Sequence, residues 1–176
     1  MWILSWGDGM TKTKQIALCA VMVALALVLS YTERFIPLQM VIPLPGVKLG
    51  LANIVTLVAL YRLSSRHALL ILVSRCILGS AFGGGITGLL FSLIGGLLAL
   101  GIMTAAKRIK FFSVYGVGIL GAAAHNLGQI LTSMLLMQSV YVGAYLPYLL
   151  VVAVFTGFAT GAACGGILRV LRKGMV

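Results

Sequence analysis

The stretch ITGLLFSLIGGLLALGIMTAAKRIK, residues 86–110, decides the fold class of this chain. Residues 86–106 contain no charged side chain, and three basic residues follow within 107–110. A helix needs about 20 mainly apolar residues to cross the hydrocarbon core of a bilayer. The stretch therefore predicts a membrane-spanning helix that ends in a basic cluster.

The composition of the whole chain extends this prediction. Of its 176 residues 61% are hydrophobic and only 9% are charged, and the mean hydropathy is +1.16. A soluble domain of this length needs a far more polar surface. We therefore expect an all-α, polytopic membrane protein with a tail at 1–13 and one transmembrane domain at 14–173. Apolar runs separated by polar breaks predict six spanning helices, at about 14–31, 49–63, 68–82, 86–106, 114–137 and 148–168.

The basic residues predict how these helices are oriented. The chain has 13 Lys and Arg against two acidic residues, Asp8 and Glu33, which gives a net charge of +11. Ten of the 13 fall at the two termini and in alternate loops: Lys12, Lys14, Arg62, Arg66, Lys107, Arg108, Lys110, Arg169, Arg172 and Lys173. Because cytoplasmic loops are rich in Lys and Arg, we expect both termini in the cytoplasm, in a bacterial-type cell membrane. This pattern explains the net charge without a nucleic-acid partner.

The cysteines and histidines do not predict a metal centre. Cys19, Cys76 and Cys164 lie far apart, each within an apolar run. His125 has no second His or acidic residue near it in the sequence. We interpret the cysteines as small packing residues, and we expect no metal and no cofactor.

The segment IPLQMVIPLPG, residues 36–46, separates the first two predicted helices. Its three prolines within nine positions prevent a regular helix. Irregular backbone at membrane depth is tolerated only where it is buried in protein or lines a cavity. We expect this segment to fold against the bundle as the lid of a ligand cavity.

Arg75 is a charged residue inside the apolar run 68–82. Such a residue costs at least about 2.5 kcal/mol on insertion scales and usually faces the bundle interior or a cavity. It either pairs with Glu33 or reaches the outer surface, or it contacts a bound anionic group. Arg34 and Lys48 lie near the same outer half of the predicted bundle. The outer opening of the bundle is therefore net positive and favours an anionic or polar ligand.

Further polar residues fall on two predicted helices. His125, Asn126 and Gln129 share roughly one face of the fifth. They are either interhelical contacts, each worth about 0.6 kcal/mol, or ligand contacts. Lys48 and Asn53, where the second helix begins, are either a helix-start motif or ligand contacts.

Small residues recur every four positions on two other helices. Gly157, Gly161 and Gly165 do so on the sixth, and Ala20 and Ala24 on the first. Such faces let helices approach closely. We interpret the glycines as packing within the bundle. For the alanines, a docking face for another membrane subunit competes with that interpretation.

Three motifs resemble the Gx transporter family, which is also described as heptaprenyl diphosphate synthase component I. They are PGVKLGLAN at 45–53, SLIGG at 92–96 and HNLGQ at 125–129, and the resemblance covers about 11–172. That family is similar to the substrate-binding S components of energy-coupling factor transporters. The resemblance implies a six-helix bundle that takes a small molecule from outside. It also implies docking, through alanines such as Ala20 and Ala24, on a transmembrane coupling subunit driven by two cytoplasmic ATPases.

We therefore expect an S-component-like protein that binds a micronutrient or an isoprenoid- or quinone-related compound. The expected binding residues are Lys48, Asn53, Arg75, His125, Asn126 and Gln129. The alternatives are a non-catalytic membrane subunit associated with heptaprenyl diphosphate synthesis, and a scaffold without a ligand. Prenyl diphosphate synthases hold magnesium with several carboxylates, whereas this chain has one Asp and one Glu. We expect no catalytic residues and no enzyme activity.

Overall fold

The computed structural model describes residues 11–35 and 48–173, and all regular structure within them is helical. The long elements are α1 (Lys12–Thr32), α2 (Asn53–Arg62), α3 (Ser65–Gly79), α4 (Gly85–Arg108), α5 (Val114–Met137) and α6 (Leu146–Lys173). Short helical turns are η2 (Glu33–Phe35), η4 (Ser80–Gly84) and η5 (Val140–Tyr145). The all-α class is confirmed. The proline-rich segment lies outside the described residues, so its role as a lid stays a prediction.

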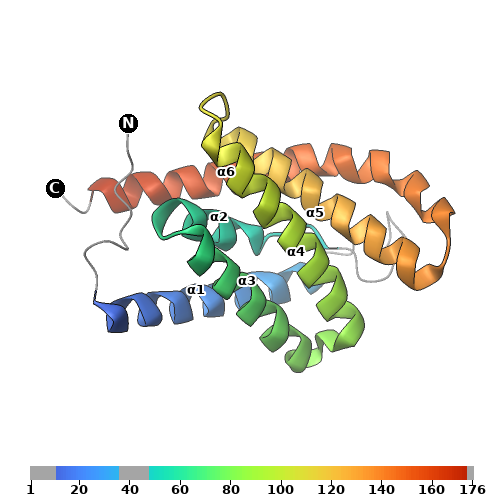
Figure 1. Ribbon diagram of the computed structural model, residues 1–176, viewed down its shortest axis with the longest axis horizontal. Coiled ribbons are helices and arrows are strands. Elements are labelled where there is room, and N and C mark those ends of the chain that lie inside the picture. The colour runs from blue at the N-terminus through green and yellow to red at the C-terminus, as the bar shows by residue number, and fades with distance from the viewer. Residues whose placement is uncertain (1–10, 36–47, 174–176) are drawn as a thin grey trace.

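The described helices include four stretches long and apolar enough to cross a membrane. They are Lys12–Thr32, Ser65–Arg108, Val114–Met137 and Val140–Leu171, and α2 is apolar but shorter. The chain is thus a multi-pass integral membrane protein. Figure 1 shows the start of α1 and the end of α6 at the same end of the bundle. The count of six spans and the cytoplasmic location of both termini stay predictions.

The stretch Ser65–Arg108 contains two helices because the chain turns between them. Phe82 and Gly83 have non-helical backbone angles, and Gly83 and Gly85 have φ of 96° and 60°. Glycine reaches positive φ without the steric cost that a Cβ brings. This turn lies between the predicted helices 68–82 and 86–106 and separates α3 from α4, and Figure 1 shows the two helices meeting there.

Four helices begin two to four residues away from their predicted positions: α1 starts at residue 12 instead of 14 and α3 at residue 65 instead of 68, and α2 and α6 differ as well. Helix α2 starts at Asn53 instead of residue 49, since Gly50 has φ of 82°, which no α-helix contains. Helix α6 starts at Leu146, before Pro147, instead of at residue 148. Proline is tolerated in the first turn of a helix, where its missing N–H would have no partner in any case.

Helix α5 lies between α4 and α6 (Figure 1) and packs closely on both. A Cβ at Gly118 would lie 2.5 Å from the carbonyl oxygen of Gly157, and one at Gly161 would lie 2.6 Å from the Cα of Tyr115. The packing interpretation of Gly157 and Gly161 is therefore confirmed. Gly165 differs, because a Cβ there would meet only the Tyr115 hydroxyl, at 3.9 Å.

Helices α1 and α2 have opposite environments. Every residue of α2 except Ile54 is buried, and α2 contacts all five other long helices. Helix α1 lies at the periphery against α2 and α3, and its Ala20 and Ala24 are exposed. The alanine face is thus accessible, while its docking role stays a prediction. All three cysteines are free and buried, as the packing interpretation expects.

Candidate ligand-binding cavity

A cavity of about 240 Å³ lies between α1, α3 and α4, beside the turn that joins α3 to α4. Its described lining is Leu27, Val28, Ser30, Tyr31, Lys48, Arg75, Cys76, Gly79, Ser80, Phe82, Gly84, Gly88 and Ser92. Pockets for small molecules measure about 300–1,000 Å³ and combine apolar walls with a few polar groups. This cavity has that mixed lining and a slightly smaller volume, which suits a small ligand.

Arg75 forms part of the cavity wall and connects three helices. Its side chain is 6% exposed. Its Nη1 donates to Ser30 Oγ of α1 and its Nη2 donates to Asn53 Oδ1 of α2, both at 3.3 Å. Its Nε has no hydrogen-bond partner within residues 11–35 and 48–173. The guanidinium is thus held in place by neutral groups that leave part of its donor capacity unused.

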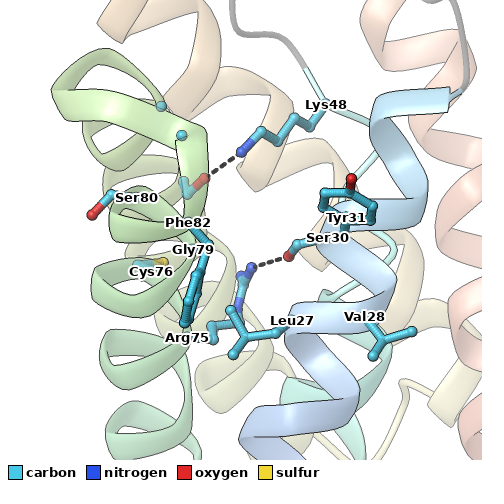
Figure 2. Close-up of a pocket in the computed structure, with 13 residues that line it drawn as sticks. Leu27, Val28, Ser30, Tyr31, Lys48, Arg75, Cys76, Gly79, Ser80 and Phe82 are labelled. Atoms are coloured by element: carbon cyan, nitrogen blue, oxygen red, sulfur yellow. Dashed lines mark hydrogen bonds between the residues drawn. The ribbon is translucent and has the colours of Figure 1, made fainter.

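Lys48 contributes a second cationic group to the same cavity. Its Nζ donates to Ser92 Oγ of α4 at 2.9 Å, and its backbone N–H donates to Gln129 Oε1 of α5 at 3.3 Å. Figure 2 shows Lys48 reaching toward α4 while Arg75 reaches Ser30 of α1, with both hydrogen bonds drawn as dashed lines. Two positive side chains therefore meet in one cavity within an apolar bundle.

Behind Lys48, Gln129 and His125 form a buried pair on α5. Gln129 is fully buried, and its Nε2 lies 3.0 Å from Nε2 of His125. Because an amide nitrogen only donates, His125 Nε2 is the acceptor, and the ring is neutral with its proton on Nδ1. A Cβ at Gly50 would lie 3.0 Å from the ring, and one at Gly95 would lie 2.8 Å from it. Both glycines are needed for the ring to fit.

Asn126 lies on a different side of α5. Its Nδ2 donates to the carbonyl oxygen of Leu149 on α6 at 2.7 Å. One residue further along an α-helix turns a side chain by about 100°, which takes Asn126 away from His125 and toward α6. The geometry supports the interhelical interpretation for Asn126. A ligand contact for it stays a prediction that no contact near the cavity supports.

Glu33 brings a carboxylate to the same end of the bundle. It is buried, and it accepts a hydrogen bond from the backbone N–H of Leu51. Burial raises the pKa of this carboxyl, while the Leu51 N–H and the charges of Arg75 and Lys48 oppose the rise. The site thus combines two cations with one acid.

A comparison with known protein families found a match over most of the chain. A family model described as heptaprenyl diphosphate synthase component I matches residues 22–167, which includes every described cavity-lining residue. The chain belongs to the heptaprenyl diphosphate synthase component I family. The predicted family is confirmed. No curated protein and no solved structure matched the chain.

In this member of the heptaprenyl diphosphate synthase component I family, the structure brings most of the predicted site residues together. Lys48 and Arg75 line the cavity, Gln129 and Asn53 accept hydrogen bonds from them, and His125 is hydrogen-bonded to Gln129. Whether any of these residues binds a ligand stays a prediction.

Sequence reasoning assigned no site role to Ser30, Ser92 or Gly95. Ser92 and Gly95 lie in the motif at 92–96 that already carried the family resemblance, which was the available signal. A lone serine in an apolar helix, such as Ser30, offers no comparable signal.

Proposed function

We propose that this protein is the membrane-embedded substrate-binding component of an energy-coupling factor-type uptake transporter. The supporting observation is a cavity that holds the cationic side chains of Lys48 and Arg75 between apolar helices. Ionisable groups inside a membrane bundle are costly and mark substrate or ion sites. In this proposal six spans place both termini in the cytoplasm of a bacterial-type cell membrane, and the cavity opens to the outside.

The energy for uptake would come from partner proteins. The sequence has no phosphate-binding loop of the ATPase type, so the chain does not hydrolyse a nucleotide by itself. The proposed partners are a transmembrane coupling subunit and two cytoplasmic ATPase subunits. The exposed Ala20 and Ala24 of α1 are the proposed docking face. The substrate would be a micronutrient or an isoprenoid- or quinone-related compound.

The family description favours a second candidate, a non-catalytic membrane subunit associated with heptaprenyl diphosphate synthesis. A catalytic role does not fit the residues, since one Asp and one Glu cannot supply the several carboxylates that hold magnesium and diphosphate. Co-purification with a soluble prenyl diphosphate synthase, together with a change in the product length of that synthase, would support this candidate over transport.

The cavity can be tested with a matched pair of glycine substitutions on α4. Gly88 lines the cavity, Gly101 is exposed elsewhere on the same helix, and a Cβ at either would meet no atom within 4 Å. Each protein is purified from membranes, and retained small molecules are identified by mass spectrometry. We expect the wild type and Gly101→Phe to retain a molecule that Gly88→Phe loses. Absence of any retained molecule from the wild type, or equal retention by both variants, would overturn the proposal.

The docking face can be tested separately. The double variant Ala20→Phe/Ala24→Phe places two large side chains on the exposed face of α1. Leu25→Phe is the control, because Leu25 is also exposed on α1 but points more than 90° away from the alanines. We expect the double variant to lose co-purification with the coupling subunit and the control to keep it. Equal co-purification would remove the docking assignment.

A further inference from the structure

We infer that the cavity binds a small amphipathic anion, with its anionic oxygen group between Arg75 and Lys48 and its apolar part against α1 and the α3–α4 turn. This inference rests on the proposed function, and it adds the chemical class of the substrate. It depends on the charge balance of the cavity, on the hydrogen bonds of Arg75 and on the chemistry of the remaining walls.

The charge balance of the cavity favours one negative charge on the ligand. Within the described residues two cationic side chains line the cavity, and Glu33 is the single carboxylate in those ranges. A buried charge without a counter-charge costs several kcal/mol because the interior solvates ions poorly. With Glu33 offsetting one cation, one positive charge remains. A monoanion would neutralise it, whereas a neutral ligand would leave it and a cation would add to it.

The hydrogen bonds of Arg75 leave room for a stronger acceptor. Its two bonds are 3.3 Å long and go to the neutral oxygens of Ser30 and Asn53. Bonds from a guanidinium to an anionic oxygen are typically about 2.7–2.9 Å and about twice as strong as neutral ones. Nε of Arg75 also lacks a partner in the described part of the chain. An oxyanion beside Arg75 would therefore gain bonds that the protein itself does not fully provide.

Lys48 can join the same oxyanion without losing its present contact. Its ammonium group attracts an anion through its charge, which acts in every direction, while Nζ keeps the hydrogen bond to Ser92 Oγ. Because Arg75 is tied to α1 and α2 while Lys48 is tied to α4 and α5, a bound anion would link these helices through the cavity.

The remaining walls determine the rest of the ligand. Leu27 and Val28 of α1 and Phe82 of the turn supply apolar surface. Phe82 is 71% exposed, so a ligand that packs on its ring would remove apolar surface from solvent or lipid headgroups. A volume of about 240 Å³ limits this part to a short aliphatic or single-ring group. The class is thus a small carboxylate, or a phosphate monoester bound in its singly protonated, monoanionic form.

The test uses three probes of one shape: phenylacetate, phenyl phosphate and the neutral phenylacetamide. Binding to the purified full-length protein in lipid nanodiscs is measured by isothermal titration calorimetry. We expect at least one anion to bind tenfold or more tightly than the amide, and the comparison of the two anions distinguishes a carboxylate from a phosphate ligand. Equal affinity for all three probes, or binding of neither anion, would overturn the inference.

Substitutions test whether Arg75 and Lys48 cause the preference for anions. Arg75→Gln should reduce anion affinity at least tenfold, and Arg66→Gln, an exposed arginine on the same helix, should not. Lys48→Gln, with exposed Lys110→Gln as its control, tests the second cation even if Arg75→Gln fails to fold. Unchanged affinity in folded Arg75→Gln or Lys48→Gln would contradict the inference.

The failure of this inference is separable from failure of the proposed function. If Gly88→Phe abolishes binding of all three probes while charge makes no difference, the cavity binds substrates and only the anionic class is wrong. If the wild type retains no molecule from the cell, the proposed function itself fails.

Discussion

Substitution of Gly95 by alanine should loosen the core of the site. A Cβ on Gly95 would lie 2.8 Å from Nδ1 of His125 and 3.1 Å from the His125 carbonyl oxygen. The imidazole cannot move far, because the backbone at Gly50 also packs against it: a Cβ on Gly50 would lie 3.0 Å from the ring. The added methyl group must therefore push α4 and α5 apart or displace the ring.

The size of the effect follows from two opposing contributions. Alanine is favoured over glycine inside a helix by about 0.8–1.0 kcal/mol. Overpacking in a filled interior costs about 1–3 kcal/mol. Gly95→Ala should therefore lower the free energy of unfolding by up to about 2 kcal/mol. Gly101→Ala on the same helix has no contact within 4 Å and should gain the propensity contribution alone. The difference between the variants, about 1–3 kcal/mol, isolates the steric contribution.

The assay is reversible unfolding by sodium dodecyl sulfate in mixed micelles, followed by circular dichroism. Mass spectrometry of retained small molecules gives a second readout, because a displaced His125 would disturb the contact of Gln129 with Lys48. Equal free energies of unfolding for Gly95→Ala and Gly101→Ala would refute the reasoning, since they would show that α4 and α5 are not in backbone contact here.

Three further predictions test other contacts. Gly161→Ala should be about 1–3 kcal/mol less stable than Gly165→Ala in the same unfolding assay, because only the first forces a Cβ against the backbone of α5; equal stabilities would contradict the packing. Asn126→Leu should lower the free energy of unfolding by about 0.6–1.7 kcal/mol and leave the retention of small molecules unchanged. Gln129→Leu should reduce that retention. If Asn126→Leu also loses retained molecules, Asn126 belongs to the binding site. Asn53→Ala removes the acceptor of a buried hydrogen bond from Arg75 and should lower stability by about 1–3 kcal/mol. Thermal unfolding measures this loss, and an unchanged stability would show that the bond is not formed.

Helix positions were largely predictable from sequence because the bilayer fixes the length of an apolar run. The stretch 86–106 became α4 (Gly85–Arg108), and 114–137 coincides with α5 (Val114–Met137). The start of α2 was not predictable in this way. Hydropathy continues smoothly through residues 49–52, and only the backbone angle of Gly50 shows that the helix has not begun.

The candidate site could be predicted residue by residue but not as an arrangement. Arg75 was identifiable because a charge in an apolar run has a cost that local sequence reveals. His125 and Asn126 are neighbours in sequence and were grouped together, yet the structure directs Asn126 to α6. Periodicity says which residues share a face of a helix, but it does not say which helix that face meets.

The sequence by itself determined that this protein lies in a membrane, is all-helical and belongs to its family, because apolar length, charge clusters and motifs are local properties. Only the tertiary structure decided that Lys48, Arg75, Ser30 and Ser92 surround one cavity. The hydrogen bond from Lys48 to Gln129 joins residues 81 positions apart, and that from Arg75 to Ser30 joins residues 45 apart. Contacts at such separations depend on how helices pack against one another, and the close approaches at Gly50, Gly95 and Gly128 set that packing.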